Sequence, residues 1–303
     1  MRIELENLIK RFGQTPAIDR LCLSIETGER VALIGPNGSG KTTLLRVLMG
    51  MLGAEGAVLV GSSSPFTQRE QLARNVAYVP QIAPQFGVPV GQLIQTICRI
   101  REIDKDRVHG LSETLGFRPA EHETKPFRDL SGGMKQKLLI ALALATEPDL
   151  LIMDEPTASL DADARRHFFE LCGELSESTT LVLCSHRVEE VRHLVGRVVA
   201  LEGGRLVADG PVEQFVASLG RAVIELRVSE PSGELATWLA ERGFRKLSGN
   251  RYTVFVEWQT KLDAVRELMT RWGGEIEDLI VNDLHELQIV HGNGSPASEK
   301  EHS

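Results

Sequence analysis

The stretch GPNGSGKT at residues 35–42 decides the fold of this chain. It matches the pattern GxxxxGK[ST], which forms a loop around phosphate groups when a strand precedes it and a helix follows. RVALI at residues 30–34 is almost continuously apolar, as in a buried central strand. KTTLLRVLMGML at residues 41–52 has the apolar spacing of a helix, which we expect to end at Gly53. The sequence therefore predicts a phosphate-binding loop between a buried strand and a helix.

The residue types in this loop suit a nucleoside triphosphate. Glycine tolerates the backbone angles that turn several N–H groups towards one phosphate, and the following helix adds the positive end of its dipole. Lys41 is placed to reach the β- and γ-phosphates, and the hydroxyl of Thr42 is placed to bind Mg²⁺. The expected nucleotide contacts of the loop are Gly35, Pro36, Asn37, Gly38, Ser39, Gly40, Lys41, Thr42 and Thr43.

A second apolar stretch supplies acidic partners for this loop. LLIMDE at residues 150–155 predicts a buried strand that ends in Asp154 and Glu155. Asp154 is expected to hold Mg²⁺, as the acidic residue after such a strand does in phosphate-loop enzymes. Glu155 is expected to polarise a water molecule aimed at the γ-phosphate. Loop and strand together predict a site that hydrolyses a nucleotide.

Composition bounds the class of protein. The chain has 303 residues, 42% of them hydrophobic and 25% charged, which is typical of a globular protein of one or two domains. A net charge of −8 argues against general nucleic-acid binding. No stretch reaches the roughly 18 apolar residues of a membrane-spanning helix, and the first residues lack the apolar core of a signal peptide. We expect a soluble, cytoplasmic chain whose four cysteines are reduced.

Strands and helices alternate over the first 218 residues. Alternating apolar and charged residues predict an antiparallel strand at residues 1–12, and TTLVLCSH at 179–186 predicts a third buried strand. Residues 87–123 are predicted to be largely helical. This order favours an α/β fold in which a mostly parallel sheet is covered on both faces and carries a helical subdomain.

The pattern changes near residue 218. Residues 219–291 predict the order strand, helix, strand, strand, helix, strand, which favours a small α+β domain of the ferredoxin-like kind. The last stretch, 292–303, is polar and rich in glycine and serine, and it is predicted to be disordered. We therefore expect two domains, 1–218 and 219–291, followed by a tail.

The motifs resemble, in order, those of the ATP-binding subunit of ABC (ATP-binding cassette) transporters, a member of the P-loop NTPases. The resemblance implies that Phe12 in KRFG stacks on adenine and that Gln81 in YVPQ touches Mg²⁺ and links the core to a membrane partner. It implies that His186 in LCSH contacts the γ-phosphate, and that Asp161 in SLD, the D-loop, is among the nucleotide contacts. The expected catalytic residues are then Glu155, His186 and Gln81, and the expected metal ligands are Thr42, Gln81 and Asp154.

A second glycine-paired stretch, LSGG at residues 130–133, precedes a strongly helix-forming segment. Ser131, Gly132 and Gly133 are therefore expected at a helix N-terminus, where exposed N–H groups favour a phosphate. The helical middle region separates this loop from the first one. In the resembled family it closes over the ATP of another copy, which implies a head-to-tail homodimer, or paired cassettes, enclosing two ATP molecules.

The resemblance also implies an ATPase that uses ATP and Mg²⁺ and drives a separate transmembrane permease from the inner face of the cell membrane. The C-terminal domain resembles accessory domains of export-type subunits and of ligand-regulated importers, so it could bind a small molecule, hold a dimer together or contact a partner. The ending NDLHELQIV at 282–290 resembles the tail of export-type subunits and favours export, including the subset that serves copper-site maturation of nitrous oxide reductase. IAPQFGVPV at 82–90 instead resembles metal importers, so import of a metal or small molecule stays open.

Two further alternatives belong to other classes. A soluble ABC ATPase that acts on DNA or ribosomes is disfavoured, because such proteins usually carry two cassettes or long coiled coils. An inactive relative is disfavoured because the lysine, the two acidic residues and the histidine of the site are all present.

Overall fold

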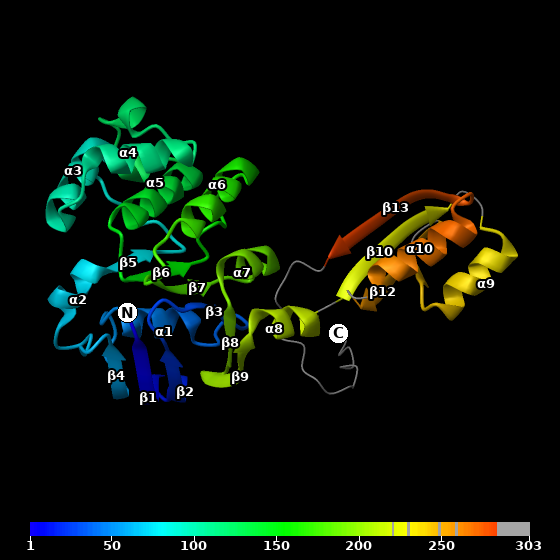
Figure 1. Cartoon of the computed structure of the whole chain (residues 1–303), viewed down its shortest axis with the longest axis horizontal. Coiled ribbons are helices and arrows are strands. Elements are labelled where there is room, and N and C mark those ends of the chain that lie inside the picture. The colour runs from blue at the N-terminus through cyan, green and yellow to red at the C-terminus, as the bar shows by residue number, and fades with distance from the viewer. Residues whose placement is uncertain (220, 229–230, 248–249, 258–259, 284–303) are drawn as a thin grey trace, which may run out of the picture.

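The computed structural model describes residues 1–219, 221–228, 231–247, 250–257 and 260–283. Its centre is a six-stranded sheet with the order β5-β6-β7-β3-β8-β9 (Figure 1). Neighbouring strands from β5 to β8 run parallel, whereas β9 at the edge runs antiparallel to β8. The strands are β3 (Arg30–Ile34), β5 (Val76–Val79), β6 (Leu150–Asp154), β7 (Thr180–Cys184), β8 (Arg197–Glu202) and β9 (Arg205–Pro211).

The central strands are buried on both faces. In β3, Val31 and Leu33 point into one core, while Ala32 and Ile34 point into another, and β6 and β7 divide their side chains in the same way. The core that contains Ala32 and Ile34 is completed by residues of α5, α6 and α7. This double burial explains the continuous apolar runs of the sequence, and it confirms the predicted α/β fold with a mostly parallel sheet covered on both faces.

A small antiparallel sheet covers the other face together with α1. Its order is β2-β1-β4, and Ile3, Leu5 and Leu8 of β1 lie in the same core as Leu44 and Leu45 of α1. The antiparallel strand expected at residues 1–12 is therefore confirmed. The strands of this sheet are β1 (Ile3–Phe12), β2 (Thr15–Ile25) and β4 (Glu55–Val60).

Helices α3, α4 and α5 share a third core, which contains Ile94, Val108, Phe127 and Leu138. Figure 1 shows this helical part on the side of the large sheet opposite α1. It contains the stretch that was predicted to be helical, and it confirms a helical subdomain. The helices of the first 219 residues are α1 (Lys41–Leu48), α2 (Arg69–Asn75), α3 (Val90–Arg101), α4 (Lys105–Thr114), η1 (Pro119–His122), η2 (Phe127–Asp129), α5 (Gly132–Ala145), α6 (Ala162–Gly173), α7 (Val188–Leu194) and α8 (Val212–Leu219).

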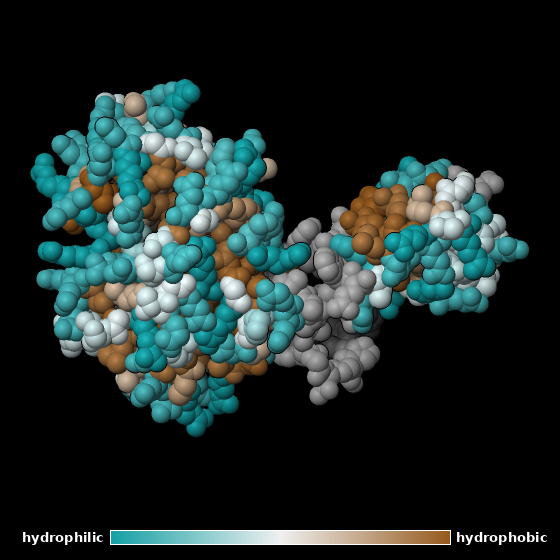
Figure 2. Space-filling model, viewed as in Figure 1, coloured by the Kyte–Doolittle hydropathy of each residue, from teal (hydrophilic) through white to brown (hydrophobic). Residues whose placement is uncertain are grey.

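The C-terminal unit is a four-stranded antiparallel sheet with the order β11-β12-β10-β13 and two helices. Its own core contains Trp238, Trp272, Leu226 and Leu235, which all belong to this unit. Figure 2 shows an apolar patch on its surface, and Phe255 is among its exposed apolar side chains. The ferredoxin-like assignment and the boundary at 218 stay interpretations of this order. The elements are β10 (Arg221–Val228), α9 (Gly233–Glu241), β11 (Arg245–Lys246), β12 (Arg251–Glu257), α10 (Lys261–Trp272) and β13 (Ile276–Asp283).

Two details of the prediction differ from the structure. Helix α1 ends at Leu48 and not at Gly53, because Gly50 takes a left-handed conformation with φ 67° and the N–H of Met51 donates to the carbonyl of Arg46 at 2.8 Å. The hairpin of β8 and β9, with α8 after it, had no counterpart in the sequence interpretation.

Some predictions concern residues outside the described part of the chain. The tail at 292–303 lies there, and so does most of NDLHELQIV. Within the described ranges, none of the helices combines the length and the apolar character that crossing a membrane requires.

Candidate nucleotide-binding site

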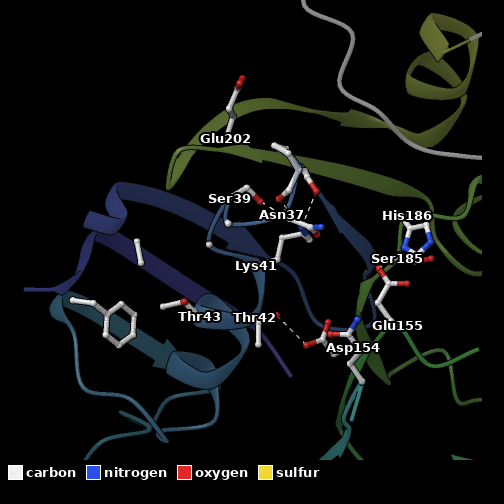
Figure 3. Close-up of a pocket in the computed structure, with 17 residues that line it drawn as sticks. Asn37, Ser39, Lys41, Thr42, Thr43, Asp154, Glu155, Ser185, His186 and Glu202 are labelled. Carbon is white, nitrogen blue, oxygen red and sulfur yellow. Dashed lines mark hydrogen bonds and ion pairs between the residues drawn. The ribbon is translucent and has the colours of Figure 1, made fainter. Parts of the chain in front are cut away.

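The loop between β3 and α1 shapes a cavity of about 970 Å³, a size that accommodates a nucleotide (Figure 3). Two glycines let the loop pack closely on its surroundings. A Cβ atom on Gly35 would lie 2.1 Å from the carbonyl oxygen of Leu201, and one on Gly40 would lie 2.4 Å from that of Ala17. The lining residues are Phe12, Ala17, Gly35, Pro36, Asn37, Gly38, Ser39, Gly40, Lys41, Thr42, Thr43, Gln81, Asp154, Glu155, Ser185, His186 and Glu202.

Lys41 supplies the positive charge at the phosphate loop. Its ammonium group donates to the carbonyl oxygens of Gly35 at 2.6 Å and Pro36 at 3.0 Å, so the side chain curls back into the bend of the loop. A cation held there by backbone oxygens lies next to the N–H groups of the loop and the N-terminus of α1. Both features favour an anion at this place.

Thr42 and Asp154 bring two oxygen donors together beside the loop. The hydroxyl of Thr42 donates to Oδ2 of Asp154 at 3.1 Å, although 112 residues separate the two in sequence. Asp154 is only 3% exposed, and burial raises its pKa, while the hydrogen bond from Thr42 and the nearby charge of Lys41 oppose that rise. A carboxylate that burial disfavours in its charged form is well placed to pair with a divalent cation.

The donor set fits Mg²⁺. Within the described residues no group of three or more His, Cys, Asp and Glu gathers as a complete metal site. Mg²⁺ is usually held by one or two protein oxygens, with substrate phosphates and water completing its shell. Thr42 and Asp154 therefore offer the number and kind of ligands expected for Mg²⁺ bound together with a nucleotide.

Glu155 and His186 form a second polar pair in the cavity. Nδ1 of His186 lies 2.8 Å from Oε1 of Glu155, and the two residues follow the neighbouring strands β6 and β7 (Figure 3). The N–H of Glu155 also donates to the carbonyl of Cys184 at 2.9 Å. Glu155 has φ 48°, a left-handed conformation that is uncommon for a residue other than glycine and is often found at functional sites.

The remaining expected contacts divide into two groups. Phe12 and Gln81 are exposed and lie in the lining of the cavity, where the sequence interpretation expected them. Ser131, Gly132, Gly133 and Asp161 are not among its lining residues. The structure thus gathers the first group at one site and leaves the second group elsewhere on the same chain.

The second group forms a compact unit of its own. Ser131 caps α5 by accepting from the N–H of Met134 at 3.3 Å, and Asp161 caps α6 by accepting from the N–H of Ala164 at 2.8 Å. Lys137 of α5 pairs with Asp161 at 2.7 Å, and this hydrogen bond lowers the pKa of Asp161. The helix that follows the LSGG loop is therefore joined to Asp161 of the SLD loop.

Sequence reasoning did not select three residues that line the cavity, Ala17, Ser185 and Glu202. Ser185 directly precedes His186, and Glu202 ends the apolar run of β8. Polar residues at the ends of parallel strands were the signal that selected Asp154 and His186, and the same signal applied to β8 would have selected Glu202.

Comparison with known proteins gives consistent results. A family model described as "ABC transporter" matches residues 18–158. The Nod factor export ATP-binding protein I of Cupriavidus metallidurans is 35% identical over 250 residues, covering 79% of this chain and 82% of that protein. The high-affinity zinc uptake system ATP-binding protein of Bacillus subtilis is 35% identical over 217 residues, covering 67% of this chain and 91% of that protein.

Solved structures share the fold. An ATP-binding subunit of an ABC transporter superposes with a TM-score of 0.66 at 23% identity, covering 72% of this chain and 93% of that chain. A dimeric ATP-binding cassette in a post-hydrolysis state, bound to ADP and Pi, superposes with a TM-score of 0.61 at 22% identity, covering 69% and 98%. Motifs, fold and relatives agree, and the chain belongs to the ATP-binding subunits of ABC transporters.

Proposed function

We propose that this chain binds Mg-ATP in the cavity at the phosphate loop and hydrolyses it. The pairing of Glu155 with His186 in the same cavity as the Thr42–Asp154 pair supports the proposal, because a group that can act as a general base and groups that can bind Mg²⁺ line one cavity. The nucleotide contacts proposed on this chain are Phe12, Gly35, Pro36, Asn37, Gly38, Ser39, Gly40, Lys41, Thr42 and Thr43.

Each residue has a separate task in this proposal. Phe12 stacks on adenine, the loop N–H groups and Lys41 hold the phosphates, and Thr42, Asp154 and Gln81 hold Mg²⁺. When bound, Mg²⁺ neutralises charge on the phosphate oxygens. The oxygen of the attacking water bonds to the γ-phosphorus, and Glu155 accepts a proton from this water. At the same time the bond between the γ-phosphorus and the β–γ bridging oxygen breaks. His186 orients Glu155 and contacts the γ-phosphate, and the products are ADP and phosphate.

We further propose that two copies close head to tail around two ATP molecules. Ser131, Gly132, Gly133 and Asp161 are not in the lining of the cavity of their own chain, which supports a role on the nucleotide of another copy. Ser131 is the N-cap of α5, and Gly132 and Gly133 begin this helix, so all three lie at a helix N-terminus, which favours a γ-phosphate. Closure would then drive a separate permease at the inner face of the cell membrane.

Export is the direction we propose. A second Nod factor export ATP-binding protein I, from Cupriavidus pinatubonensis, aligns with 84% of this chain, which is more than residues 1–218 can supply. The alignment with the zinc uptake protein covers 67% and needs no part of the C-terminal unit. Likeness to export proteins therefore extends further along the chain. Import of a metal or small molecule is the second candidate. Over the residues that align, the zinc uptake protein and the export protein of Cupriavidus metallidurans have the same identity to this chain, 35%.

Phosphate release from the full chain tests the hydrolysis proposal. The chain should release phosphate from ATP in the presence of Mg²⁺, and little when EDTA removes the metal. Absence of release in both conditions would contradict it. Co-purification of a membrane protein with the tagged chain from its host would support a permease partner, whereas co-purification with ribosomes or DNA would support the other class.

A further inference from the structure

Helix α7 buries an acidic side chain that contacts the loop of the proposed catalytic residue Glu155. Glu190 is 1% exposed, and it is not among the residues that line the cavity. The hydroxyl of Thr157 donates to its Oε1, and the nearby hydroxyl of Ser185 favours the charged form of this carboxylate. The guanidinium Nε of Arg187 lies 3.6 Å from the same Oε1. Glu190 is therefore the centre of a buried polar cluster that the proposed mechanism does not use.

This cluster joins the two loops that carry the catalytic pair. Thr157 follows Glu155 by two residues in the loop after β6, and Ser185 directly precedes His186 in the loop after β7. The hydroxyl of Ser185 also accepts from the N–H of Arg187 at 3.0 Å, which fixes the start of α7 to the same loop. One carboxylate thus lies next to a residue of each loop.

The cost of burying this group indicates that its geometry matters. Burial raises the pKa of Glu190, while the hydrogen bonds from Thr157 and Ser185 oppose that rise. Oε2 of Glu190 is buried and has no hydrogen-bond partner within the described part of the chain. A buried acid with one unsatisfied oxygen costs stability that an apolar side chain of the same size would not. Helix packing alone does not account for a carboxylate here.

Glu155 needs support of this kind. Its left-handed backbone, with φ 48°, persists only when its surroundings hold it. A displacement of about 1 Å in a catalytic group costs roughly 100-fold in rate. The loop between Glu155 and Thr157 is short, so holding the hydroxyl of Thr157 in place restricts the position of the Glu155 carboxylate.

We propose that Glu190 is a positioning residue for hydrolysis: by accepting from Thr157, on a helix whose start is bonded to Ser185, it holds the loops of Glu155 and His186 at the distance at which these two residues pair. The inference rests on the proposed ATP hydrolysis at this site. It concerns turnover and not nucleotide affinity, because Glu190 does not line the cavity in which the phosphate loop lies.

Four variants of the full chain test this inference. Glu190→Ala should lower kcat for Mg-ATP about 10- to 100-fold and change KM less than about twofold. Glu190→Gln should recover most of the loss, since its amide oxygen still accepts from Thr157. Thr157→Val, which keeps the side-chain shape, should lose several-fold in kcat. Glu189→Ala is the matched control, because Glu189 is the exposed acidic neighbour on the same helix and its loss should leave kcat unchanged.

A double variant separates positioning from a loss of folding. In the Glu155→Gln background, Glu190→Ala should add nothing further to the loss of single-turnover phosphate release, because both changes act through one carboxylate. If Glu190→Ala lowered single-turnover phosphate release in the Glu155→Gln variant by the same factor as in the wild type, the inference would be overturned. Unchanged kcat in Glu190→Ala would also overturn it, as would a defect in Glu190→Gln as deep as that of the alanine variant.

The outcomes distinguish this inference from the proposed function. If the wild type and Glu189→Ala hydrolyse ATP and Glu190→Ala does so equally well, only the role of Glu190 fails. If the wild type itself does not hydrolyse ATP, both proposals fail. Should Glu190→Ala not fold, Thr157→Val and Glu190→Gln carry the same test through kcat and KM.

Discussion

Oε1 of Glu155 lies 2.8 Å from Nδ1 of His186, although Glu155 follows β6 and His186 follows β7. Glu155 also has a left-handed backbone conformation. The closeness of the two residues follows from the parallel pairing of β6 with β7, which places Asp154 opposite Cys184 at the same sheet edge. Directly after Asp154, Glu155 takes its left-handed conformation, and its N–H donates to the carbonyl of Cys184 at 2.9 Å. The pair is thus a product of strand order and one strained residue.

Glu155→Gln should stop turnover and preserve ATP binding. The amide keeps the size of the side chain and loses the base, so kcat should fall about 100- to 10,000-fold. Bound ATP should then persist and trap the closed dimer. Gel filtration with Mg-ATP should show a dimer for this variant and a monomer without nucleotide. A monomer under both conditions would count against the head-to-tail closure.

Lys41→Ala should abolish ATP binding. Among the described residues that line the cavity, Lys41 is the one lysine. Each charge-assisted bond to phosphate is worth roughly 1.5–3 kcal/mol, so affinity should fall about 100-fold or more. Calorimetry measures this directly, with Lys105→Ala in the helical part as a control that should bind normally. Equal affinity in both variants would refute the assignment of the phosphate loop.

Ser131→Arg should spare ATP binding and block hydrolysis, because a large cation would occupy the place where another copy's γ-phosphate is proposed to lie. The change also removes the cap of α5, which costs about 1 kcal/mol. Ser131→Ala removes the same cap without the bulk, so it is the control for stability. Normal phosphate release by the arginine variant would disprove a role for this loop in trans.

Lys137→Met should lower the melting temperature at neutral pH by a few degrees at most, because the Lys137–Asp161 pair is partly exposed. Lys137 holds the pKa of Asp161 below its usual value of 3.8. The pair therefore stabilises the fold above that value, and its contribution is lost as the pH falls through the lowered pKa. Melting curves of both proteins should converge in acid. A constant difference from pH 7 to pH 3 would exclude this ion pair as the cause.

Truncation after residue 218 should leave ATP binding intact. The C-terminal unit has its own core, and none of the cavity-lining residues belongs to it. The shortened chain should bind ATP with an affinity within about twofold of the full chain by calorimetry. A large loss of affinity, with the fold retained by circular dichroism, would contradict the separation of the two units.

Local patterns predicted much of this protein. Continuous apolar runs identified β3, β6 and β7, since each strand divides its side chains between two cores. The spacing of glycines and Lys41 predicted the phosphate loop, because the motif lies within eight consecutive residues, 35–42. The confirmed family follows from the order of these motifs.

Features that depend on packing were not predicted. The left-handed backbone of Glu155 follows from its surroundings and leaves no mark in the composition of the loop. The cap at Asp161 and its pairing with Lys137 depend on the approach of α5 to α6. Glu190 was missed for the same reason: on sequence it is one of two adjacent glutamates, and only the fold separates the buried one from the exposed one.

The backbone of Glu155 has a consequence for protein engineering. A left-handed conformation costs a residue with a Cβ atom roughly 1–2 kcal/mol, and glycine takes it without that cost. A selection for heat resistance alone would therefore favour Glu155→Gly and enrich variants that melt later and lack the general base proposed for ATP hydrolysis. Any directed evolution of this chain towards thermostability needs a turnover screen at every round.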